Sequence, residues 1–372
     1  MSPLAIPVSS ARPTPPSRAD FAHSPLVVFY ELTRACDLAC RHCRADAQTR
    51  RNPAELSTDQ ARKLIAQLAT FPKPPLLVLT GGDPLKRDDV FEIIAAARQA
   101  GLQVALTPSA TPLVTHDALQ RLKVAGLHRL AVSLDGADAA THDDFRRVAG
   151  SFNRTLDILR DARDCGLPLQ VNTTIARHNA HQVDALAELL APLGIVLWSV
   201  FFLVPTGRAS ASQRIAPEAY ETLFAQLLDH VGRQPYAIKT TEAPHFRRFV
   251  LNAAKAAGRQ APTNVSMAGT NDGRGVLFIS HTGEIFPSGF LPISCGRFPF
   301  DSVVSVYQGS TLFRLLRTAE SITGKCSVCE FREICGGSRA RAYGLTGDPM
   351  ASDPDCVYVP LRWKQESATC SA

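Results

Sequence analysis

Six short β-rich runs alternate with helical stretches between about residue 25 and residue 205 of this 372-residue chain. A repeated order of strand and helix implies a parallel sheet joined by right-handed crossovers. The runs are largely apolar, which fits a sheet that is covered on both faces. They are LVVFYEL (26–32), LLVLT (76–80), QVALT (103–107), RLAVSL (129–134), LQVNTTI (169–175) and VLWSVFFLV (196–204).

The stretch between the first two runs shows the helical pattern most clearly. In STDQARKLIAQLA, Ser57 is a good N-cap residue. Six strand–helix units fall short of the eight in a full barrel. We therefore expect an α/β fold built on a partial (β/α)6 barrel. The buried face of this first helix is predicted to consist of Ala61, Leu64, Ile65 and Leu68.

Three cysteines follow the first run directly, in TRACDLACRHC: Cys36, Cys40 and Cys43. A cubane iron–sulfur cluster that is held by three thiolates keeps one iron free for another ligand. An open coordination position distinguishes a chemical site from a structural one. The C-x3-C-x2-C spacing also differs from that of zinc sites, where cysteine pairs are followed by a second pair or by histidines. The sequence therefore predicts a reactive iron–sulfur centre on this loop.

A second cysteine group lies near the C-terminus, with the spacing C-x2-C-x5-C and a fourth cysteine 21 residues later. By itself this pattern fits a four-cysteine zinc site as well as a fully ligated iron–sulfur cluster. The spacing alone leaves both readings open. The group consists of Cys326, Cys329, Cys335 and Cys356, whereas Cys165, Cys295 and Cys370 fit neither group.

Polar residues and glycines stand at the ends of the predicted strands, where parallel barrels carry their functional groups. The second run ends in GGDP (81–84), and glycines let a backbone approach a ligand closely. The fourth run ends in SLDG (133–136), and Asn172 lies in the fifth. Arg146 follows in THDDFR, where it can bind a carboxylate bidentately or form a surface pair with an aspartate.

The cysteine loop, GGDP and SLDG together resemble the radical S-adenosylmethionine (radical SAM) enzymes. The resemblance implies that the first cysteine group holds a [4Fe–4S] cluster whose open iron binds S-adenosylmethionine (SAM). The family usually has GGEP and an aromatic residue before the third cysteine, where this chain has Asp83 and His42. An imidazole can also stack on adenine; otherwise His42 caps the loop. The implied SAM contacts are His42, Gly81, Gly82, Asp83, Pro84, Ser133, Asp135, Arg146 and Asn172.

The C-terminal region resembles the SPASM domain, an α+β domain that binds auxiliary [4Fe–4S] clusters. The resemblance implies that the second cysteine group holds one such cluster. We expect one and not two, because Ser288 and Arg339 stand where further cysteines are usual. The vacated space is then a place for substrate. Arg339 and Arg341 would either meet a substrate carboxylate there or lie as solvated charges on a helix.

The resemblance implies reductive cleavage of SAM to a 5′-deoxyadenosyl radical, which abstracts hydrogen from a substrate carbon. The runs TGGDPLKR, VPTGR, HTGEIFPSGFLP and CGGSRARAY are closest to the haem and haem d1 biosynthesis branch, which favours a tetrapyrrole substrate. The alternatives are modification of a peptide or protein, and a non-catalytic metal or electron-transfer protein. A flavodoxin or ferredoxin would supply the electron. Thr206 and Arg208, in VPTGR, are expected to line the substrate side.

Three further side chains are candidates for general acid or base near the barrel cavity: Glu242, His245 and Asp272. No spacing motif connects them to the cysteines. Their assignment depends on where the fold places them.

Composition excludes several classes of function. The net charge of +6 is mild and the basic residues form no long run, so we expect no nucleic-acid partner. The longest apolar stretch, 195–204, is about half of a membrane span, so we expect no membrane insertion. Ten cysteines without a secretory signal indicate a reducing cytoplasm. The expected organisation is a disordered Pro-rich tail (1–22), the barrel (23–210), connecting helices (211–262) and the SPASM-like domain (263–372).

Overall fold

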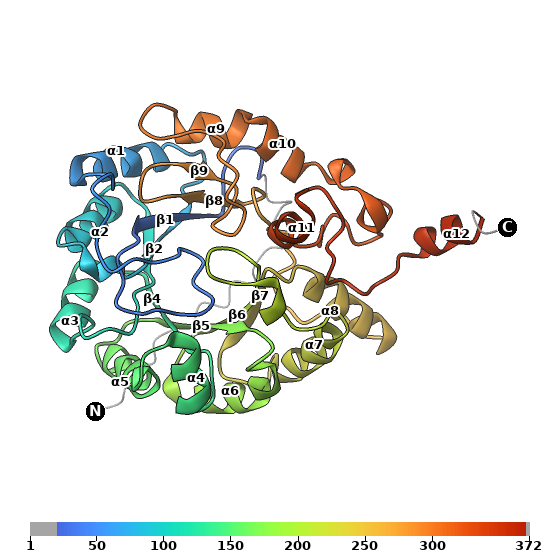
Figure 1. Cartoon of the computed structure of the whole chain (residues 1–372), viewed down its shortest axis with the longest axis horizontal. Helices are drawn as coiled ribbons and strands as arrows, with labels where there is room; N and C mark the ends of the chain where they lie inside the picture. The colour runs from blue at the N-terminus through green and yellow to red at the C-terminus, as the bar shows by residue number, and fades with distance from the viewer. Residues whose placement is uncertain (1–20, 370–372) are drawn as a thin grey trace, which may run out of the picture.

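A computed structural model of the chain describes residues 21–369. Within this range the strands form one sheet, with helices around its outer side (Figure 1). The strands are β1 (Val27–Thr33), β2 (Leu76–Gly81), β3 (Gln103–Leu106), β4 (Arg129–Ser133), β5 (Leu169–Ile175), β6 (Leu197–Phe202), β7 (Ala237–Thr241), β8 (Val276–Ile279) and β9 (Ile285–Phe286).

The strand order is β7-β6-β5-β4-β3-β2-β1-β8-β9. Strands β1 to β6 coincide with the six predicted runs and pair in parallel, so the partial barrel is confirmed. The sheet also extends beyond the expected barrel boundary at residue 210, because β7 adds to β6 and β8 adds to β1. An unpaired edge strand exposes a row of backbone donors and acceptors. The segments that follow the sixth strand supply the missing partners on both edges.

The helices between the strands cover the outer side of the sheet, and α12 projects away from the rest (Figure 1). No helix in residues 21–369 is both long and apolar enough to cross a membrane. The helices are α1 (Thr58–Leu68), α2 (Val90–Gln99), α3 (His116–Val124), α4 (Ala139–Arg146), α5 (Ser151–Asp164), α6 (Val183–Leu190), α7 (Ala219–His230), α8 (His245–Ala256), α9 (Val303–Gly309), α10 (Thr311–Arg317), α11 (Arg339–Thr346) and α12 (Leu361–Thr369).

Helix α1 begins as its sequence predicts. The Ser57 side chain accepts a hydrogen bond from the Gln60 backbone N–H, and the Gln60 side chain accepts one from the Ser57 N–H. This capping box satisfies two N–H groups that a helix start leaves unpaired. The buried residues of the helix are the predicted four: Ala61, Leu64, Ile65 and Leu68.

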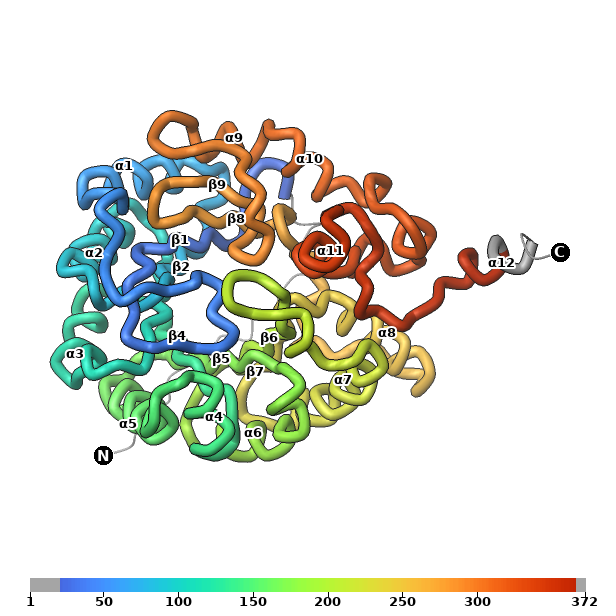
Figure 2. Tube along the Cα trace, viewed as in Figure 1, coloured from blue at the N-terminus to red at the C-terminus, as the bar shows by residue number. Residues whose placement is uncertain are grey.

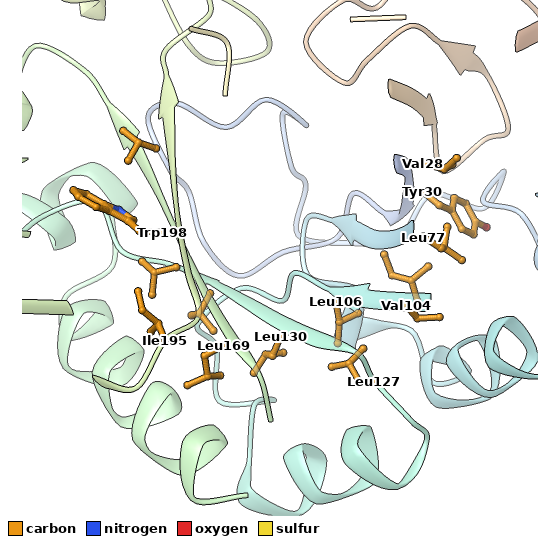
Figure 3. Packing of buried hydrophobic residues seen from close by; sticks show 14 of the residues in the cluster. Val28, Tyr30, Leu77, Val104, Leu106, Leu127, Leu130, Leu169, Ile195 and Trp198 are labelled. Atoms are coloured by element: carbon orange, nitrogen blue, oxygen red, sulfur yellow. The ribbon is translucent and has the colours of Figure 1, made fainter. Parts of the chain in front are cut away.

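The main core lies between the sheet and the surrounding helices (Figure 3). Leu77, Leu130 and Leu169 are fully buried on β2, β4 and β5. Each such side chain contributes about 1.5–3 kcal/mol when it leaves water. The buried Trp198 satisfies its indole N–H by donating to Thr173 Oγ1 at 2.9 Å. This core is the rigid frame that positions the loops at the strand ends.

The N-terminal end of the described range differs from the predicted tail. Residues 1–20 of that tail, and Cys370, lie outside the described residues. Phe21, however, is buried, and its carbonyl oxygen accepts a hydrogen bond from the Tyr307 hydroxyl at 2.7 Å. The aromatic side chain packs against Gly275, where an added Cβ would lie 2.7 Å from the ring. The packed chain therefore begins before residue 23.

Candidate functional site

The three-cysteine loop follows β1 and crosses the C-terminal end of the barrel (Figure 2). Cys36 and Cys40 are buried, and Cys43 is half-buried. Two backbone hydrogen bonds close the base of the loop: Cys36 N–H donates to Gln48 O at 2.7 Å, and Gln48 N–H donates to Arg34 O at 2.8 Å. The loop is therefore held as a unit at the end where parallel barrels place their chemistry.

The segment after β6 holds the far side of this loop. Arg208 donates to Cys40 O from Nε and to Ala47 O from Nη1, both at 3.0 Å. Gly207 has a φ of +63°, and a Cβ there would lie 2.4 Å from the carbonyl oxygens of Cys43 and Arg44. Arg208 thus fastens the cysteine loop, whereas Thr206 lines a hollow beside it. Arg208 therefore has a structural role on the loop, and its predicted place on the substrate side stays a prediction.

Each sulfur of the loop has a neighbouring hydrogen-bond donor. Leu38 N–H lies 3.3 Å from Cys36 Sγ, and Ala47 N–H lies 3.4 Å from Cys43 Sγ. Arg146 Nη1 lies 3.6 Å from Cys40 Sγ. Burial raises the pKa of the Cys36 and Cys40 thiols, and these donors oppose that shift. Donors to sulfur are also what tunes the reduction potential of an iron–sulfur cluster.

The GGDP turn packs directly against the cysteine loop. A Cβ on Gly81 would lie 2.2 Å from Thr33 O, and one on Gly82 would lie 2.4 Å from Ala35 O. The glycines are therefore required by a close approach within the chain itself. The Asp83 carboxylate is buried and accepts from Leu85 N–H and from the Thr111 hydroxyl. Burial raises the pKa of Asp83. Pro84 begins the short 3₁₀ turn that Asp83 caps.

Asp135 is the centre of a buried charge cluster beside Cys40. Its Oδ2 lies 2.5 Å from Arg146 Nη2 and 3.6 Å from His42 Nε2. Burial alone would raise the pKa of Asp135, but the charge of Arg146 holds it below its usual value. The His42 ring stacks on Phe145, with centroids 3.9 Å apart, and burial lowers its pKa to about 3. His42 is therefore a neutral stacking group in the fold.

Ser133 and Asn172 lie next to each other, as register partners on β4 and β5. Both are half-buried at the C-terminal side of the sheet. Nearby, Arg146 Nε and His42 Nδ1 are buried without a hydrogen-bond partner among the described residues. Buried polar atoms are nearly always paired. Unpaired polar atoms beside three thiols fit a site that a polar ligand completes, which is what SAM on an open cluster would require.

The structure brings two of the three candidate acid–base residues together. Glu242 directly follows β7 with a φ of +58°. Its Oε2 accepts from the Ser338 hydroxyl, and its carbonyl accepts from Arg341 Nη1 at 2.7 Å. Burial and the charge of Asp272 raise the pKa of Glu242 well above its usual value. Asp272 is buried and accepts from Ala340 N–H at 2.9 Å, so Glu242 and Asp272 form a coupled acid pair.

His245, the third candidate, lies elsewhere. It is fully buried and lines a hollow of about 380 Å³ that the second cysteine group also lines. Burial lowers the pKa of His245 to about 3. The structure thus places His245 beside the second cysteine group, and a role as general acid or base stays a prediction. Helix α8 starts at this residue.

The hollow is lined by all four cysteines of the second group: Cys326, Cys329, Cys335 and Cys356. Arg248 and Lys325 stand in the same wall. Burial raises the pKa of Cys335 to about 12 and that of Cys356 to about 11, so metal binding must displace their protons. In residues 21–369 no set of three His, Cys, Asp or Glu side chains is arranged around a single-ion site.

Arg339 and Arg341 do not reach a substrate or the solvent. Arg341 is fully buried and binds Asp353 bidentately, with Nε–Oδ1 3.0 Å and Nη2–Oδ2 2.8 Å. Arg339 donates to the carbonyl oxygens of Pro349 and Ala351. Both expectations for these arginines are therefore wrong. The acidic partner that sequence reasoning missed, Asp353, stands in an irregular loop with no motif to mark it.

The comparisons with known proteins agree with this arrangement. Residues 30–190 match the Radical SAM superfamily. An AdoMet-dependent heme synthase of Nitratidesulfovibrio vulgaris is 41% identical over 90% of this chain and 93% of its own length. A pre-heme d1 synthase of Dinoroseobacter shibae is 32% identical over 92% of this chain and 89% of its own.

A solved structure extends the agreement to the fold. Streptococcus suis SuiB, in its crystal structure bound to S-adenosylmethionine, gives a TM-score of 0.70 at 16% identity and covers 90% of this chain and 78% of its own. A radical SAM domain implies SAM and a [4Fe–4S] cluster as cofactors. From the cysteine loop, the partial barrel and these relatives, we conclude that the chain is an enzyme and belongs to the radical SAM superfamily, in the branch of its heme synthase relatives.

Proposed function

We propose that the protein cleaves SAM reductively at a [4Fe–4S] cluster held by Cys36, Cys40 and Cys43, and uses the 5′-deoxyadenosyl radical on a side-chain carbon of a tetrapyrrole. The observation that carries the proposal is the open three-cysteine loop, with one donor beside each sulfur, at the C-terminal end of a partial barrel. The cofactor supplies the radical chemistry; the chain holds the cluster, places the substrate and excludes water.

The SAM contacts follow from the groups that remain around this loop. Arg146 Nε and His42 Nδ1 are two buried polar atoms beside the loop that have no hydrogen-bond partner in the described part of the chain. The backbone of residues 81–84, together with Ser133, Asp135 and Asn172, completes the proposed SAM wall. The side chains of Asp83 and Asp135 act indirectly, since both are occupied by contacts within the fold.

The four-cysteine hollow is the proposed auxiliary [4Fe–4S] centre. Four thiols there leave no iron open, which favours electron transfer over direct substrate binding. A low-potential flavodoxin or ferredoxin is the proposed electron donor. The tetrapyrrole class is supported by the relatives in the haem branch, which are named for the synthesis of heme and pre-heme d1.

Three cysteine variants test the two centres separately. After anaerobic reconstitution we expect about eight irons per chain, four from each cluster. Cys36→Ala and Cys335→Ala should each lose about half of that iron. Only Cys36→Ala should also abolish formation of 5′-deoxyadenosine from SAM and dithionite. Cys295→Ala is the matched control, because Cys295 is half-buried and belongs to neither group.

The outcomes separate the rival assignments. SAM cleavage that survives in Cys36→Ala would contradict the first centre. About four irons and one zinc in the wild type would assign the second group to zinc. Substrate class is read from titrations of the wild type with a porphyrin and with short peptides. A Soret shift on binding supports the tetrapyrrole, whereas peptide binding without any porphyrin binding would move the protein to the peptide-modifying class.

A further inference from the structure

A hollow of about 160 Å³ opens beside the cysteine loop. Its wall is built from the end of β1, the cysteine loop, the segment after β6 and the β8–β9 hairpin, which Figure 2 shows close together at the centre of the molecule. Ala45 and Asp46 belong both to this wall and to the cysteine loop. A molecule in the hollow would therefore lie against the loop that carries the reactive centre.

Two guanidinium groups stand in the wall, both oriented by one buried carboxylate. Glu31 is fully buried on β1, and its Oε1 lies 3.2 Å from Arg34 Nε. Its Oε2 lies 3.0 Å from Arg44 Nη2, and its Oε1 also lies 2.8 Å from His281 Nδ1. Burial alone would raise the pKa of Glu31, but Arg44 and His281 bring it to about 2. The Glu31 carboxylate thus forms ion pairs with the guanidinium groups of both Arg34 and Arg44.

The charges of the wall leave a positive excess. Asp46, the other carboxylate in the wall, lies 3.9 Å from Arg208 Nη1 and has its own positive neighbour. Arg34 uses Nε for Glu31, and its terminal nitrogens have no hydrogen-bond partner among residues 21–369. Its side chain is 40% exposed. Arg34 therefore presents a prepositioned, unfilled fork to the hollow, which is the geometry that binds a carboxylate bidentately.

The rest of the wall is apolar and aromatic. The rings of Phe278 and Phe286 lie 6.1 Å apart and within 17° of parallel. Arg44 covers the Phe278 ring with its Cζ 4.6 Å from the centroid. Gly289 keeps this wall open, since a Cβ there would lie 2.9 Å from the Phe278 ring and 3.0 Å from Arg44 Cδ. The hollow thus combines an aromatic surface with a free guanidinium.

We propose that this hollow is the carboxylate subsite for the substrate, in which the terminal nitrogens of Arg34 bind a side-chain carboxylate while Phe278 and Phe286 contact the apolar body that bears it. The inference rests on the proposed function and adds to it where the substrate binds and by which group. Glu31 and Arg44 are positioning residues that hold Arg34 and the aromatic wall in place. A carboxylate anchored here brings the carbons next to it close to the cysteine loop.

The test compares two probes on matched variants. The probes are an iron porphyrin with four carboxylate side chains and its tetra-amide, titrated by absorbance. The wild type should bind the acid at least about tenfold more tightly than the amide. Arg34→Gln should remove that difference, and Arg34→Lys should restore part of it, because an ammonium keeps the charge but not the fork. Arg160→Gln, an exposed arginine of α5 that pairs with Asp157, should keep it in full.

Every outcome bears on the proposal. Equal binding of acid and amide to the wild type, or an unchanged difference in Arg34→Gln, overturns the subsite while leaving a porphyrin substrate in place. Weaker SAM binding in Arg34→Gln with an unchanged acid–amide difference assigns Arg34 to SAM and also overturns it. No porphyrin binding to the wild type overturns the tetrapyrrole substrate and this subsite together. Circular dichroism shows whether each variant is folded.

Discussion

Arg146 lies between a buried carboxylate and a cluster cysteine: its Nη2 is 2.5 Å from Asp135 Oδ2, and its Nη1 is 3.6 Å from Cys40 Sγ. Asp135 is fully buried, and the Arg146 side chain is 12% exposed. The ion pair therefore orients a guanidinium toward the sulfur. The fold at the end of β4 and the chemistry of the cysteine loop depend on the same side chain.

Replacing Arg146 with glutamine should destabilise the cluster-free protein by about 3 kcal/mol, because a buried carboxylate loses its partner. The Asp135→Asn/Arg146→Gln double variant should recover part of the loss. Since the folded pKa of Asp135 is lowered, its stabilisation is present at neutral pH and is lost as the pH falls through that pKa. Urea unfolding at pH 7 measures the effect. Arg160→Gln is the exposed control, and an equal cost in both single variants would contradict the prediction.

Glu242 should keep its proton to a higher pH than an ordinary glutamate does, because burial and the Asp272 charge raise its pKa. A folded state that binds a proton more tightly than the unfolded state loses stability as the pH rises above the ordinary carboxyl pKa. Glutamine mimics the neutral acid. The free energy of unfolding of Glu242→Gln, relative to that of the wild type, should therefore increase by about 1 kcal/mol between pH 5 and pH 8. Urea unfolding at both pH values checks this gain. The exposed Glu333→Gln should show no such gain in stability. A stability difference from the wild type that does not change with pH in Glu242→Gln would refute the raised pKa.

Gly207→Ala should displace the cysteine loop. The new Cβ would meet the carbonyl oxygens of Cys43 and Arg44 at 2.4 Å, in addition to the strain of a φ of +63°. Gly258 has a φ of +62° with nothing within 4 Å of its added Cβ, so Gly258→Ala has the strain without the clash. We expect Gly207→Ala to cost about 1–3 kcal/mol more and to lower the iron content of the first cluster. Equal stability and iron content in the two variants would exclude this contact as the reason for the glycine.

Local pattern was sufficient where each residue acts through its neighbours in sequence. The six runs were correctly predicted as β1 to β6 because a strand that is buried on both faces of a sheet is apolar along its length. Recognising such a run does not require knowing which residues it will contact. The capping box at Ser57 and Gln60 likewise depends on residues three apart. The spacing of Cys36, Cys40 and Cys43 constrains the chemistry before any fold is known.

The environment of charged residues with distant partners was predicted wrongly, because the sequence does not show which side chains the fold brings into contact. Arg339 and Arg341 appeared free in sequence, yet the fold buries both and pairs Arg341 with Asp353. Glu31 stands in an otherwise apolar strand, and its partner His281 is 250 positions away.

By itself, the sequence determined the strand–helix order, the two cysteine groups and the radical SAM resemblance, because these depend on periodicity and spacing. The tertiary structure alone decided which side chains meet: that His245 faces the second cysteine group, that Glu242 shares a site with Asp272, and that Arg34 faces a hollow beside the cysteine loop. The physical reason is that burial and charge pairing act through space. Their energies depend on groups that the chain brings together only when the sheet is complete.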